Sequence, residues 1–126
     1  MQIYTIYFDT NTMKMNAELI QLTADNPDEI YFEINKTLNA TGFDFFDYSD
    51  DIAILVDDQG FFKKGLPVFD IESEYGDHNK LAGKLVFVRN VVNEFSTDIG
   101  SITYEDVFKL KTQLNIKFVG FTKGVN

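Results

Sequence analysis

GFDFFDYSDDIAILVDDQGFFKKGLPVF, residues 42–69, is the stretch that decides the fold of this 126-residue chain. Two runs rich in aromatic and β-branched residues, 43–48 and 52–56, are separated by Ser49–Asp50–Asp51, which is typical of two strands joined by a tight turn. The second run is continuously apolar, which predicts a strand buried on both faces. Further on, Gly60 is expected to take a positive φ in a turn, and Pro67 argues against a central strand.

The N-terminal side of this stretch predicts two strands and a helix. Residues 2–8 carry apolar groups on both faces, which indicates a central strand, and residues 17–22 form a second strand. The helix begins after the cap Asn26 and ends at Gly42. Its buried face consists of residues spaced four apart, namely Ile30, Ile34 and Leu38.

The C-terminal side predicts, in order, a polar loop, a strand, a second loop, a helix and a last strand. These are residues 71–80, residues 81–89 with a bulge at Gly83, residues 96–101, a helix from Thr103 to Asn115, and residues 116–121. Thr103 and Asp106 approximate a capping box at the helix start. We therefore expect one α+β domain over residues 1–126, with an antiparallel or mixed sheet of about five to seven strands and two helices on one side.

The charge of the chain is strongly negative and unevenly distributed. The net charge is −9; residues 1–60 hold 12 acidic and 2 basic side chains, and residues 61–126 hold 8 and 9. An acidic first half argues against binding of nucleic acid or of a membrane surface, because both present phosphates that require Lys and Arg. It favours a partner protein with a basic surface. The alternative is that the acidic charge only keeps a phenylalanine-rich domain soluble.

Several kinds of chemistry are absent from the sequence. The chain has no cysteine, which excludes disulfides and zinc-thiolate sites and fits a reducing cytoplasm. The one histidine, His78, lies in a polar segment, and no nucleophile, phosphate-loop or zinc-protease motif is present. No signal peptide or apolar run long enough to span a membrane is found. We therefore expect a protein that is not an enzyme and uses no cofactor.

Carboxylates leave two catalytic alternatives open. Asp57 to Gly60, together with Asp50 and Asp51, offers several oxygens to a divalent metal, although the spacing is not that of an EF-hand. A pair of carboxylates about 5–9 Å apart in a cleft would suit a hydrolase.

The preferred hypothesis makes the aspartates themselves the partner-binding surface. Arrayed along strands and turns, they would engage Lys and Arg of a partner, and an array of this kind can imitate the phosphates of DNA. Nearby aromatic side chains would serve as apolar anchors. The predicted binding residues are Asp44, Asp47, Asp50, Asp51, Asp57, Asp58, Tyr48, Phe61 and Phe62. The alternative is a solvated acidic edge that only prevents strand-to-strand aggregation.

Two segments of the chain resemble a family of small proteins of unknown function that bacteriophages and mobile elements carry. They are VDDQGFFKKGLP, residues 56–67, and LAGKLVFV, residues 81–88. The shared pattern is an acidic pair with Gly, a Lys-Gly-Leu-Pro step and a glycine-containing strand; after Pro67 the sequence departs from it. The resemblance implies no catalytic residue. It implies an accessory protein that acts in the bacterial host cytoplasm on a host protein, such as a nucleic-acid-binding defence or replication factor. The alternative within this setting is a structural or assembly protein that self-associates.

Overall fold

The computed structural model describes residues 1–92 and 97–124, and in these ranges it contains nine strands, two α-helices and one 3₁₀ turn. The strands are β1 (Gln2–Asp9), β2 (Lys14–Gln21), β3 (Phe43–Asp47), β4 (Ile52–Asp57), β5 (Lys64–Glu72), β6 (His78–Ala82), β7 (Leu85–Val92), β8 (Thr97–Gly100) and β9 (Asn115–Lys123). The helices are α1 (Pro27–Leu38) and α2 (Tyr104–Gln113), and the 3₁₀ turn is η1 (Gly60–Phe62).

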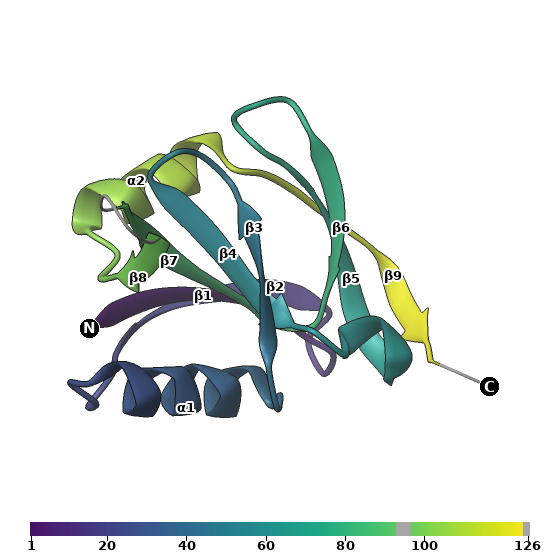
Figure 1. Cartoon of the computed structure of the whole chain (residues 1–126). Coiled ribbons are helices and arrows are strands. Elements are labelled where there is room, and N and C mark those ends of the chain that lie inside the picture. Colours follow the sequence, from purple (N-terminus) through teal and green to yellow (C-terminus); the bar gives the residue numbers. More distant parts are fainter. Residues whose placement is uncertain (93–96, 125–126) are drawn as a thin grey trace.

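The strands form two antiparallel sheets (Figure 1). The large sheet has the order β2-β1-β7-β4-β3, with β8 paired to β7, and the small sheet has the order β6-β5-β9. The α+β class and the two helices are confirmed. The large sheet lies within the predicted range of strands, and the small sheet is an addition that the sequence did not indicate.

Burial of β4 on both faces creates two cores. Ile52, Ile54 and Val56 join the core that the large sheet shares with the small sheet and α2. Ala53 and Leu55 join a second core on the opposite face, beneath α1. The prediction of a doubly buried strand is confirmed, since every residue of β4 is buried. The two helices consequently cover opposite faces of the large sheet, rather than one side as predicted.

Both helix starts follow the sequence, and both helix ends differ from it. The Asn26 side chain accepts a hydrogen bond from the Glu29 backbone N–H (3.0 Å) at the start of α1. The helix then stops at Asn39, which adopts the left-handed conformation (φ 54°) that asparagine tolerates, so Gly42 is not its end. At the other helix, Leu114 is already extended, and Asn115 belongs to β9 instead of closing α2.

Pro67 is the clearest departure from the predicted strands, because it lies in β5, the middle strand of the small sheet. The pairing of β5 with β9 shifts register between Lys64 and Pro67. Within this irregular segment the Leu66 N–H donates to the Thr122 hydroxyl (2.9 Å) instead of a ladder carbonyl. A residue without an N–H is tolerated at such a bulge.

Two glycines have roles other than those predicted. Gly83 (φ +90°) does not bulge a continuous strand; it turns the chain from β6 in the small sheet into β7 in the large sheet. Gly60 is not among the described residues with positive φ. A side chain there would place Cβ 3.1 Å from the Ala82 carbonyl oxygen, so the position needs glycine for close packing.

The two predicted loops are largely strand. Of residues 71–80, only 73–77 lie outside β5 and β6, and of residues 96–101, β8 takes 97–100. Residue 96 lies outside the described residues. Polar and charged side chains on the solvent face of a sheet gave both segments a loop-like composition.

Candidate functional site

The β3–β4 hairpin divides its six aspartates between two ends. Asp47, Asp50 and Asp51 surround the turn that joins the strands, whereas Asp44, Asp57 and Asp58 lie near the opposite end. A strand of six residues is about 20 Å long at roughly 3.3 Å per residue. That length exceeds the screening distance of about 8 Å at physiological salt. The hairpin therefore presents two separate groups of charge and not one continuous row.

The three aspartates at the turn, which we call the hairpin-end aspartates, are exposed and converge on one region. Asn90 Nδ2 donates to Asp47 Oδ1 (3.1 Å), and its N–H bonds the Asp51 carbonyl (2.8 Å). The Asp51 carboxylate lies 3.6 Å from the Arg89 guanidinium, which also makes a bidentate pair with Asp106. The Asp47 and Asp51 carboxylates thus each have one neighbouring polar or charged group and still face solvent.

Two residues of the β5–β6 connection complete this region. The Tyr75 hydroxyl donates to Asp50 Oδ1 (2.5 Å), and the Glu74 backbone N–H donates to the carbonyl of Tyr48 (2.8 Å). The hydrogen bond to Asp50, partial desolvation and the nearby charges of Asp50, Asp47 and Glu74 raise the pKa of Tyr75 to about 12. The Glu74 carboxylate pairs with Lys109. Five carboxylates, counting Asp106, therefore face two cations.

No sequence pattern points to Glu74 and Tyr75 as site residues. They lie in a segment predicted to be a polar loop, 25 residues beyond the hairpin turn, and no local pattern shows that it folds back onto the turn. Tyr75 is 55% exposed and sits among the carboxylates, so it has the position of an aromatic anchor.

At the other end of the hairpin, one of the three aspartates is buried and paired. Asp57 is buried; it accepts from the Gln59 N–H (2.9 Å) and forms an ion pair with Lys63 (2.5 Å). It is therefore a structural carboxylate and not part of an exposed surface, contrary to the prediction. Asp44 and Asp58 are exposed.

The predicted aromatic anchors do not accompany the hairpin-end aspartates. Tyr48 is only 3% exposed and belongs to the core between the sheets, so it is unavailable to a partner in this fold. Phe61 and Phe62 are 52% and 62% exposed, but they lie in η1, which follows β4 at the opposite end of the hairpin.

The described residues contain few groupings of side chains suited to catalysis or metal binding. His78 lies on β6, with Nδ1 3.4 Å from Asp70 and Nε2 3.8 Å from Glu72. Among the described residues, no three His, Asp or Glu side chains are arranged to hold a metal ion. Asp50 and Asp51 lie at the other end of β4 from Asp57 and Asp58, so these residues do not form the single oxygen cluster considered from the sequence.

No helix in the described part of the chain has the length and apolar content needed to cross a bilayer. Comparison with protein-family models, with curated proteins and with solved structures gave no significant match. The resemblance to phage and mobile-element proteins stays a prediction.

Proposed function

We propose that this protein is a non-enzymatic binding protein whose hairpin-end aspartates and Tyr75 bind a basic surface on a partner protein. In the setting that the resemblance implies, it is a phage or mobile-element accessory protein in the bacterial cytoplasm. Its partner there is a host nucleic-acid-binding protein, which it inhibits.

One observation supports this proposal above the others. Asp47, Asp50 and Asp51 are exposed together at one end of the molecule, beside a half-exposed tyrosine that hydrogen-bonds one of them. Exposed ion pairs contribute only about 0.2–1 kcal/mol each, so three of them would give encounter and orientation more than affinity. The aromatic ring of Tyr75 supplies the desolvated contact that such a surface otherwise lacks.

The geometry favours a local contact over imitation of a length of duplex. DNA carries one charge per roughly 1.7 Å of axis, so the length of β4 would correspond to about twelve phosphates. The hairpin has six aspartates over that length, and one of them, Asp57, is buried and paired. A partner's basic groove would therefore be contacted at a few positions near the hairpin turn.

The test is capture from a bacterial lysate by immobilised protein. The variant Asp47→Asn/Asp50→Asn/Asp51→Asn should capture at least tenfold less partner than the unchanged protein. Capture by the unchanged protein should weaken as the salt concentration rises. The control is Asp25→Asn/Asp28→Asn/Glu29→Gln, which removes the same charge from exposed positions before and in the first turn of α1.

If the hairpin variant captures as much partner as the unchanged protein, these aspartates do not form the binding surface. An equal loss in both variants would assign the effect to net charge and not to a surface. Release of the captured protein by added duplex DNA would show that the partner's nucleic-acid groove is the part engaged.

A second candidate, a self-associating assembly protein, is favoured by the open edges of the large sheet. Strands β2 and β3 each pair on one side only in the described chain, and an exposed edge is a template for another strand. Sedimentation velocity over a hundredfold range of concentration separates the two candidates, because the binding protein remains one species.

A further inference from the structure

Strand β2 forms an open edge of the large sheet, and the direction of its backbone groups can be derived from one bond. The Leu22 N–H donates to the Met1 carbonyl (2.8 Å), which makes these residues a hydrogen-bonded pair. Because such pairs alternate along an antiparallel ladder, the even-numbered residues of β2 bond to β1. The N–H and C=O groups of Met15, Ala17 and Leu19 therefore point away from the sheet.

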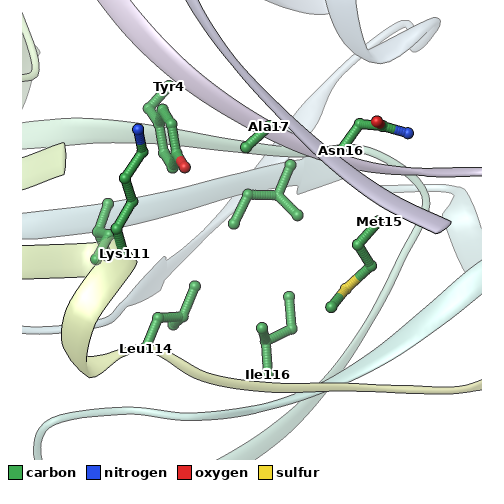
Figure 2. Close-up of a pocket in the computed structure, with 9 residues that line it drawn as sticks. Tyr4, Met15, Asn16, Ala17, Lys111, Leu114 and Ile116 are labelled. Carbon is green, nitrogen blue, oxygen red and sulfur yellow. The ribbon is translucent and has the colours of Figure 1, made fainter. Parts of the chain in front are cut away.

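A pocket of about 210 Å³ lies directly beside this edge. Figure 2 shows Met15 on one side of it, with Leu114 and Ile116 along another and Ala17 above. The remaining lining residues are Tyr4, Ile6, Asn16, Leu110 and Lys111. A cavity of roughly 150 Å³ accommodates a benzene molecule, so this pocket matches one Leu, Ile, Met or Phe side chain.

Ala17 connects the edge to the pocket. It lines the pocket with its small side chain, and its backbone groups point toward the open edge. A strand added to β2 would place one residue opposite Ala17, with its side chain on the same face of the sheet. That side chain would enter the space that a larger residue at position 17 would fill.

The polar groups of the pocket rim indicate the charge of the occupant. The Tyr4 hydroxyl makes no hydrogen bond to another described residue and is turned toward the pocket in Figure 2. Lys111 lies beside it, and among the described residues its ammonium takes part in no ion pair. A donor and a cation on one rim suit a carboxylate close to the apolar side chain.

We propose that β2 and this pocket bind an extended segment of another protein by strand addition. The segment carries one medium-sized apolar side chain opposite Ala17 and an acidic residue two positions away on the same face. Main-chain hydrogen bonds would supply affinity and the pocket would supply selectivity. A second copy of β2 suits the site less well: its symmetric registers place Ala17, Met15 or Leu19 of the copy opposite Ala17, and none of these three has an acidic residue two positions away. The proposal does not depend on the hairpin-end aspartates.

The probe is a seven-residue peptide, Thr-Glu-Thr-Leu-Thr-Glu-Thr, acetylated and amidated, titrated into ¹⁵N-labelled protein. The two glutamates make it independent of strand direction. We expect amide shifts centred on Met15, Ala17 and Leu19, at least tenfold weaker binding when the central Leu is Gly, and weaker binding when both Glu are Lys.

Two protein variants locate the site. Ala17→Leu fills the pocket while keeping the edge, and Ala17→Pro removes an outward N–H while keeping the bonds to β1; both should abolish binding. The hairpin variant Asp47→Asn/Asp50→Asn/Asp51→Asn should bind the peptide as the unchanged protein does.

Absence of shifts at millimolar peptide, or equal affinity for the Leu and Gly peptides, would overturn the proposal. It would also be overturned if the protein formed dimers that Ala17→Leu abolishes, because the occupant would then be a second copy of this chain.

Discussion

Strands β2 and β3, the two ends of the main strand order of the large sheet, differ in how they meet solvent. Strand β3 has five residues, two of them aspartates, and its Phe43 ring packs between Tyr31 (5.3 Å) and Phe45 (5.5 Å). Strand β2 has eight residues and borders the pocket with Met15 and Ala17. Carboxylates on an edge oppose the approach of another strand. The charges of β3 are thus two carboxylates of like sign, whereas β2 carries one charge of each sign, Lys14 and Glu18. On the proposal above, β3 is the edge that repels another strand and β2 is the edge that receives one.

The largest expected effect concerns α2, which forms the wall of the pocket beside β2. Asp106 is buried, caps α2 through Thr103 and pairs with Arg89. Burial alone would raise the pKa of Asp106, but the hydrogen bonds from Thr103 and the Arg89 guanidinium outweigh it and lower this pKa. Asp106→Ala should reduce the free energy of unfolding by about 3 kcal/mol, measured by urea denaturation at neutral pH.

This loss should depend on pH in one direction. A carboxyl group whose pKa is lower in the folded state stabilises the fold above its unfolded pKa, about 3.9, and that stabilisation disappears as pH falls through the folded value. The penalty of Asp106→Ala should therefore be constant from neutral pH to about pH 5 and shrink below pH 4. Glu105→Ala, at an exposed position in the same turn, should cost less than about 1 kcal/mol. Equal penalties for both variants would contradict the assigned role.

The next effect tests the direction of the backbone groups along β2. Asn16→Pro removes an N–H that bonds to β1, whereas Ala17→Pro removes one that points outward. We expect the first substitution to destabilise by about 2 kcal/mol more than the second. Denaturation curves of the two variants measure this difference directly. If Ala17→Pro were the more destabilising substitution, the odd-numbered residues of β2 would be the ones bonded to β1. The strand-addition proposal would then fail.

The smallest effect concerns the protection of β3. Asp44→Val/Asp47→Val removes both carboxylates from this edge and should make self-association detectable at a concentration at least tenfold lower than for the unchanged protein. Sedimentation velocity measures it. Glu18→Val removes the one carboxylate of β2 and is the control; Asp44→Val alone matches it in the number of charges removed. If both variants associate equally, charge does not distinguish the two edges.

The local features of the fold follow from the sequence, whereas several long-range ones do not. The caps at Asn26 and Thr103 and the doubly buried β4 depend on neighbouring residues, and all three are confirmed. The small sheet depends on pairing between β5 and β9, whose partners are far apart in the sequence. Its solvent face is charged, so Glu72 and His78 resembled loop residues.

In the candidate site too, local features follow from the sequence and long-range contacts do not. The density of aspartates in the β3–β4 hairpin was visible in the sequence, but the burial of Asp57 and Tyr48 depends on Lys63 and on the core between the sheets. The return of Tyr75 to the hairpin turn depends on how the small sheet packs. The pocket at Ala17 also combines distant segments, β1, β2, α2 and the start of β9. No local pattern encodes these contacts.

The sharing of strands between the two cores also bears on unfolding. Like β4, strands β1 and β7 place alternate side chains in both cores, so neither core can open without exposing the opposite face of the same three strands. We therefore expect the domain to unfold in a single transition, and a substitution beneath α1 to lower the stability of both cores together.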